Sequence, residues 1–274
     1  MKIVVLTSGM DSLFLLDKVR SEHRGAEVIP VWYDLGMKFS ACERAHLPEF
    51  VESQDMSNYS RILDSYAIDG VDHFSFLYEG MILHALRTYH PDKIMMGVVA
   101  TDLGYQDNTL EWVADFNAKM GRDVLSYPFL ELGWGKKEIL QWALNKGLSV
   151  GSAAAAHCCR SNLALVGGCG SCWSCLRKRG VFKSFGLETP IPSFLERPSK
   201  RVIEALIECK YNLSFGHGMT MEEDMLLAEY MPSLIEDLGL KDVGHLDIDA
   251  VVAALKVATE DKMDILAHEL ETFL

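Results

Sequence analysis

Long apolar runs are missing from this sequence. None reaches the length of about 18 residues that a membrane-spanning helix requires. The first stretch, Met1 to Gly9, breaks into a turn sooner than the apolar region of a signal peptide would. We therefore expect a soluble, cytoplasmic protein that has no membrane partner.

Basic charge is also scarce. The chain has 26 Lys and Arg against 39 Asp and Glu, which leaves a formal net charge of -13. A surface built to neutralise nucleic-acid phosphates needs the opposite balance. A nucleic-acid partner is therefore not expected, and a small molecule is the expected partner.

An evenly spread set of cysteines, as in a disulfide framework, is absent as well. Of the seven cysteines, five crowd between Cys158 and Cys175, a pattern that favours metal binding in a reduced compartment. The remaining two, Cys42 and Cys209, are expected to be small buried residues.

The crowded cysteines have the spacing of a zinc site. Cys169, Cys172 and Cys175 form C-x2-C-x2-C, which supplies three thiolate ligands from one turn. We expect Cys159 to be the fourth ligand in preference to its neighbour Cys158, with His157 as a substitute. A redox dithiol and an iron–sulfur cluster are the alternatives, and both fit less well because a dithiol needs two cysteines and nothing else indicates electron transfer.

Apolar runs typical of buried strands alternate with amphipathic segments typical of helices. The predicted strands are Ile3 to Leu6, Val28 to Tyr33, His73 to Phe76, Ile94 to Val99 and Val124 to Tyr127. The predicted helices are Ser12 to Arg20, Ala41 to Gln54, Tyr78 to Tyr89, Leu110 to Met120 and Lys136 to Asn145. This alternation predicts an α/β fold with a parallel sheet covered by helices on both faces.

Three parts are expected along the chain. Residues 1–150 form the α/β nucleotide-binding domain, residues 151–190 the zinc-binding segment and residues 191–274 an acidic helical extension. The helix predicted from Met221 to Leu238 has an apolar stripe that packs on the core or on a protein partner.

The first strand ends in a turn suited to phosphate. Its residues are Thr7, Ser8, Gly9, Met10, Asp11 and Ser12. Backbone N–H groups and the positive end of the following helix meet there, and the hydroxyl groups add donors. Asp11 is a candidate helix cap or Mg²⁺ ligand. An ordinary helix start is the alternative interpretation, and the turn lacks the lysine and the spacing of a Walker A loop.

This turn resembles the PP-loop signature Ser-Gly-Gly-X-Asp-Ser, with Thr7 in place of the first serine and Ser8 in place of the first glycine. PP-loop enzymes cleave ATP between its α and β phosphates. With the cysteine cluster, about the first 185 residues resemble the QueC family of 7-cyano-7-deazaguanine synthases. Further shared features are Tyr33 to Gly36, Glu43, the stretch Gly97 to Thr109, Pro128, the Lys136-Lys137-Glu138 helix start and an arginine matched by Arg177 or Arg179.

The resemblance implies a Rossmann-like (HUP, adenine nucleotide alpha hydrolase-like) fold with a zinc-binding cap, and a homodimer. It implies ATP, Mg²⁺ and Zn²⁺, and the chemistry of an ATP-dependent ligase that adenylates 7-carboxy-7-deazaguanine, forms the amide with ammonia and dehydrates it to the nitrile. The turn residues would bind phosphates and magnesium, and main-chain groups near Val31 and Gly97 would bind adenine. The substrate would be contacted by Asp102, Tyr105 and Asp107. Lys136 would contact the phosphates.

The departures from the family fall where the substrate should lie. Gln106-Asp107-Asn108-Thr109 stands in place of Pro-Asp-Cys-Arg, and Glu79-Gly80 in place of Arg-Asn. Two arginines suited to a carboxylate are thereby lost. Three alternatives therefore stay open: a QueC-like ligase with another acceptor, which stops at the amide or joins a deazaguanine to a protein; a catalytically inactive nucleotide-binding module; and a tRNA-modifying PP-loop enzyme.

Overall fold

The computed structural model describes residues 1–37, 40–58, 73–102, 106–156, 168–170 and 172–193, and short pieces between 229 and 254. The chain divides into two compact units, Met1–Val166 and Gly167–Leu274. The division into three parts expected from the sequence stays a prediction. None of the helices in the described residues is both long and apolar enough to cross a membrane.

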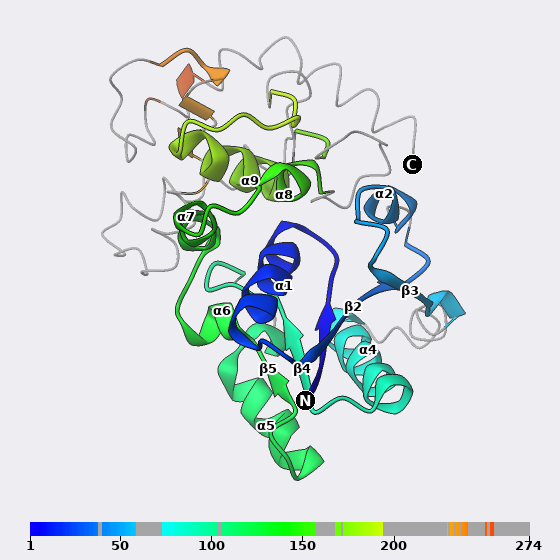
Figure 1. Ribbon diagram of the computed structural model, residues 1–274. Helices are drawn as coiled ribbons and strands as arrows, with labels where there is room; N and C mark the ends of the chain where they lie inside the picture. Colours follow the sequence, from blue (N-terminus) through cyan, green and yellow to red (C-terminus); the bar gives the residue numbers. More distant parts are fainter. Residues whose placement is uncertain are drawn as a thin grey trace. The chain divides into compact units, whose positions relative to one another are not determined.

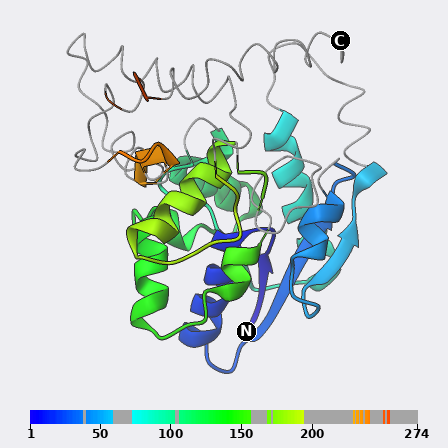
Figure 2. The same cartoon turned by 90° about the horizontal axis from the view of Figure 1, so that it is seen from above.

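The first unit is built on a parallel sheet in the order β3-β2-β1-β4-β5. Its strands are β1 (Lys2–Leu6), β2 (Glu27–Asp34), β3 (Glu52–Asp55), β4 (Lys93–Met96) and β5 (Leu125–Ser126). The strand β1 lies in the middle of the sheet, between β2 and β4 (Figure 1). Seen from above, the lighter blue β2 and β3 run out to one side of the dark blue β1 (Figure 2). This is the order of a Rossmann-like α/β fold, as the sequence predicted.

The helices of the first unit lie between the strands and after β5. They are α1 (Met10–Glu22), α2 (Ser40–Ala45), α4 (His73–Tyr89), the 3-10 turn η1 (Gln106–Asn108), α5 (Leu110–Met120), α6 (Pro128–Glu131), α7 (Lys136–Asn145) and α8 (Gly151–Ala155). The second unit contains α9 (Trp173–Ser184).

Two apolar clusters hold the helices on opposite faces of the sheet. On one face, Val4 of β1 and Ile94 of β4 belong to a cluster with Ile82 of α4 and Phe116 of α5. On the other face, Leu13 of α1 packs with Trp32 of β2 in a cluster that extends to α8. Successive side chains of a strand point to opposite faces, so β2 contributes to both clusters, with Val31 and Tyr33 in the first and Trp32 in the second.

Two predicted elements were wrong. Residues 73–76 begin the helix α4 and are not a strand. The residues that follow them in α4 are buried at helical spacing, and this longer pattern outweighs the short alternation His-Phe-Ser-Phe. The helix predicted from Ala41 to Gln54 ends at Ala45, and Glu52–Asp55 forms β3. That strand is polar because it lies at the edge of the sheet, where apolar residues are not required.

Candidate functional site

The carboxyl ends of β1 and β4 lie at the point where the strand order reverses. Ligands of open α/β sheets bind in the crevice beside such a point. A cavity of about 190 Å³ is found there in the first unit. It is lined by residues of the β1–α1 turn, the ends of β2 and β4, the helix α4 and the segment before α5: Leu6, Thr7, Ser8, Gly9, Asp11, Ser12, Val31, Trp32, Tyr33, Tyr78, Met81, Met96, Gly97, Val98, Asp102 and Asn108.

The turn after β1 is organised by the hydroxyl group of Ser12. Its Oγ accepts hydrogen bonds from the backbone N–H groups of Ser8 (2.8 Å) and Gly9 (3.0 Å), and it donates to the carbonyl of Gly9 (2.9 Å). Gly9 is the N-cap of α1. The N–H groups expected to meet phosphate therefore converge on one side chain at the positive end of a helix.

Two residues of this turn point into the protein interior. The hydroxyl of Thr7 donates to the carbonyl of Val5 at 3.0 Å, and its N–H donates to the carbonyl of Val31 at 2.8 Å. Met10 is buried at the start of α1. Thr7 therefore ties the turn to β2 through its N–H group.

Asp11 is ion-paired with Lys136, which lies 125 positions further along the chain at the start of α7. Both side chains are mostly buried, with 17% and 10% of their surface exposed. The second carboxylate oxygen of Asp11, Oδ1, is buried and has no hydrogen-bond partner among the described residues. Such an orphaned oxygen in a native site indicates a place for a ligand, a water or a cation.

Gly97 lets the end of β4 lie against the start of α1. A Cβ atom on Gly97 would approach the backbone N of Ser12 to 2.8 Å and the carbonyl carbon of Asp11 to 3.0 Å. These are backbone atoms, which cannot rotate away as a side chain can. Glycine is therefore required at this position, because the end of β4 packs against the turn from Thr7 to Ser12, called the phosphate turn below.

The segment before α5 holds the substrate-side candidates. Asp102 lines the cavity, and its carboxylate accepts a long hydrogen bond of 3.4 Å from the N–H of Val99. Asn108 Nδ2 donates to the carbonyl of Asp102 at 3.1 Å. Asp107 is fully buried and is not part of the described cavity lining. Tyr105 lies outside the described residues.

Thr109, which stands where the resemblance to the QueC family implies an arginine, has a local structural task. It is the N-cap of α5, and its Oγ1 accepts a hydrogen bond from the N–H of Trp112 at 3.1 Å. The side chain that replaces the arginine thus turns to its own helix. It adds no positive charge to the substrate side of the site.

Several aromatic and apolar residues near the site were given no site role from the sequence, although Tyr33 was among the features shared with the family. Tyr33, Tyr78 and Met81 line the cavity. The position of Tyr33 at the carboxyl end of a predicted strand was a usable signal, whereas Tyr78 and Met81 depend on how α4 packs.

Tyr127 is fully buried, and its hydroxyl has no hydrogen-bond partner within the described part of the chain. Burial and the charge of Asp107 raise the pKa of Tyr127.

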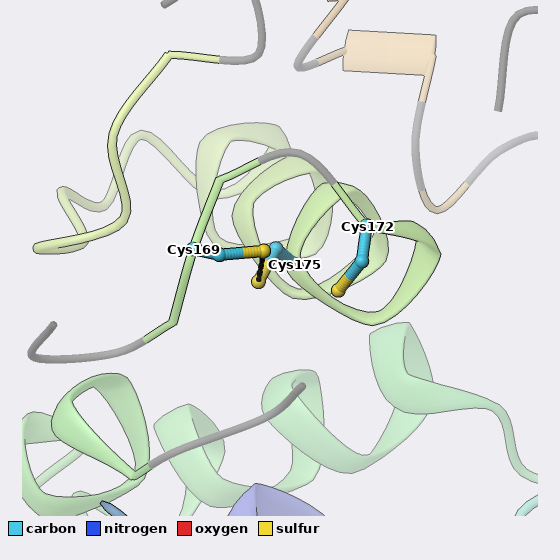
Figure 3. A group of neighbouring side chains, drawn as sticks. All are labelled: Cys169, Cys172 and Cys175. Carbon is cyan, nitrogen blue, oxygen red and sulfur yellow. Dashed lines mark hydrogen bonds between the residues drawn. The ribbon is translucent and has the colours of Figure 1, made fainter. Parts of the chain in front are cut away.

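The cysteine cluster lies in the second unit. The sulfur atoms of Cys169 and Cys175 are 3.8 Å apart, and all three sulfur atoms of Cys169, Cys172 and Cys175 lie within 4.8 Å of one another. Figure 3 shows the Cys169 and Cys175 sulfurs side by side, with the Cys172 side chain turned toward them from the start of α9. The predicted fourth ligand Cys159, with Cys158 and His157, lies outside the described residues.

The geometry of this cluster fits a metal ion. Two thiolates on one tetrahedral zinc, with Zn–S bonds of about 2.3 Å, have their sulfur atoms about 3.8 Å apart. Cys172 is the N-cap residue of α9. Cys169 and Cys175 are buried, which limits access of solvent to the cluster.

Residues 76–186 match the family described as queuosine biosynthesis protein QueC. The matched segment contains Gly97, Asp102, Lys136 and the three cysteines, while the turn from Thr7 to Ser12 lies before it. Among curated proteins, none matches the chain.

Proposed function

Because this chain is a QueC-like member of the PP-loop superfamily, we propose that it is an ATP-dependent ligase acting on 7-carboxy-7-deazaguanine. The carboxylate of that substrate attacks the α phosphorus of ATP and releases pyrophosphate. Ammonia then displaces AMP to give the amide. A second ATP activates the amide oxygen, and loss of AMP leaves the nitrile.

One contact supports this proposal most strongly, the ion pair between Lys136 and Asp11. Lys136 belongs to the segment that matches the family, and Asp11 belongs to the turn that resembles the PP-loop signature. The fold brings the two together beside the cavity, although they are far apart in sequence. A cation and converging N–H groups at one turn are what a triphosphate needs.

The residues of the turn and of the adjoining cavity would each have a separate role in binding ATP. The N–H groups of Ser8 and Gly9 would bind phosphate oxygens, with Ser12 holding them in place before ATP arrives. Lys136 would neutralise charge on the leaving pyrophosphate. The free Oδ1 of Asp11 suits Mg²⁺, which when bound neutralises phosphate charge. The apolar side of the cavity, with Val31 and Met96, would receive adenine.

The three described thiolates would hold a structural zinc with Cys159 as fourth ligand. Their separation supports this assignment. A site with four thiolate ligands leaves no open position, so the metal would be structural and take no part in the reaction.

A second candidate is a QueC-like ligase with a different acceptor. Thr109 caps α5 where the family carries an arginine, so the charge that would pair with a substrate carboxylate is missing from this position. Such an enzyme would stop at the amide or join a deazaguanine to a protein.

The test is to supply ATP, Mg²⁺, ammonia and 7-carboxy-7-deazaguanine to the purified chain. We expect AMP and pyrophosphate by chromatography and the nitrile by mass spectrometry. The variant Lys136→Met should lose the activity, and Lys93→Met, which alters a lysine away from the described cavity lining, should keep it. Accumulation of the amide would favour the second candidate. Absence of AMP with every acceptor tried would contradict both candidates and leave a nucleotide-binding module.

A further inference from the structure

The helix α9 carries the cysteine cluster at one end and two buried ion pairs in its next turns. Cys172 is its N-cap and Cys175 lies in its first turn. Arg177 Nε donates to Glu229 Oε2 at 2.8 Å, and Arg179 Nη1 donates to Asp237 Oδ2 at 2.5 Å. The acidic partners come from the part of the chain that follows the family match.

Both ion pairs are shielded from solvent. The side chains of Glu229 and Asp237 are 2% and 3% exposed, and those of the two arginines are 11% and 10% exposed. Met231 and Leu234, between the two acids, are fully buried. Removing one charge of such a pair breaks a buried ion pair, which is strongly destabilising, so these contacts fix the helix strongly. By contrast, Lys183 at the far end of α9 pairs with Glu188, which is 84% exposed.

One helix joins both arginines to two of the three cysteines, because Cys172 is the N-cap of α9 and Cys175 lies in its first turn. Cys175 and Arg179 are four residues apart, so they lie on the same face of the helix. A shift of α9 that breaks the arginine contacts also moves the sulfur atoms. Metal–ligand distances tolerate deviations of only about 0.2 Å.

We propose that Glu229 and Asp237 are positioning residues for the metal, so that metal binding at the cysteines and docking of Glu229 and Asp237 on α9 strengthen one another. This inference rests on the zinc assignment made above and not on the ligase reaction. Coupling of this kind is reciprocal: the docked segment raises the affinity for metal, and the metal raises the stability of the docked segment.

The first test measures zinc affinity of the full chain by competition with a chromophoric chelator. The double variant Glu229→Gln, Asp237→Asn keeps the shape of both side chains and removes their charge. We expect zinc affinity to fall about 10- to 100-fold, as when groups that orient metal ligands are changed. The control Glu188→Gln removes the exposed pair on the same helix and should bind zinc like the wild type.

The second test uses the wild-type chain, so it does not depend on folding of a variant. Hydrogen exchange of residues 229–240 should slow when zinc is added to the metal-free chain. Exchange that zinc does not alter, or a double variant whose zinc affinity stays within twofold of the wild type, would overturn the inference while leaving the zinc site intact. A wild-type chain that binds no zinc, and for which Cys175→Ser changes nothing, would overturn the zinc assignment itself.

Discussion

Two residues on opposite sides of the phosphate turn determine its shape. Ser12 holds the N–H groups of Ser8 and Gly9 from within the turn. Gly97 allows the end of β4 to approach the same turn from outside. The position of the N–H groups therefore depends on a hydrogen bond and on an absent side chain.

Replacing Gly97 by alanine should disturb this turn. The added methyl group would lie 2.8 Å from the backbone N of Ser12. Overpacking of this kind costs about 1–3 kcal/mol, and we expect ATP affinity to fall as well because the N–H groups shift. Urea unfolding and calorimetric titration with ATP measure the two effects. Gly151→Ala is the matched control, because its nearest contact would be Ser149 Oγ at 3.8 Å, and stability equal to that of Gly97→Ala would refute the argument.

Replacing Lys136 by methionine should cost more stability than a surface lysine would. The change leaves the carboxylate of Asp11 mostly buried without its cation, at a cost toward the lower end of roughly 3–5 kcal/mol. In Lys93→Met the lost partner is Asp123, which is 77% exposed, so the expected cost is about 0–1 kcal/mol. Chemical denaturation of both variants makes the comparison. Equal losses would show that burial of the Asp11 pair has no energetic effect.

At the scale of elements, local signals define some helices completely. The predicted helices Leu110 to Met120 and Lys136 to Asn145 have these same bounds in the structure. Thr109 caps the first helix, and Gly121, in a left-handed conformation, ends it. The carboxylate of Glu138 accepts a hydrogen bond of 2.9 Å from the N–H of Gly135, and this bond fixes the start of the second helix.

Replacing Thr109 by valine should weaken the start of α5. Valine keeps the shape but has no oxygen to accept the hydrogen bond from the N–H of Trp112. Loss of an N-cap typically costs about 1 kcal/mol, and Thr109→Ser should restore it. Urea denaturation with the two variants side by side measures the difference. If valine and serine behave alike, the cap does not stabilise α5.

At the scale of the whole molecule, the two compact units predict two separable unfolding transitions. Zinc bound at the cysteines would stabilise the unit that holds them. Because three of the four proposed ligands belong to the second unit, we expect a chelator to lower the temperature of that unit's transition more than that of the first unit in calorimetry. Cys175→Ser should abolish this response, while Cys42→Ser, in the first unit, should keep it. A chelator that shifts both transitions equally would contradict this prediction. The expected homodimer stays a prediction.

The sequence alone determined the features that depend on neighbouring residues. The central buried strands, the turn from Thr7 to Ser12, the capped helices and the C-x2-C-x2-C spacing all follow from local period, capping or ligand chemistry. These signals were enough to predict a parallel α/β sheet with a nucleotide-type turn. The polar edge strand β3 carries no such signal, so it was missed.

Tertiary structure alone decided which distant residues meet. The pair of Lys136 and Asp11, the close approach of Gly97 to Ser12 and the docking of Glu229 and Asp237 on α9 join positions far apart in the chain. No local period encodes such contacts, because they depend on how whole elements pack and on which charges become buried together.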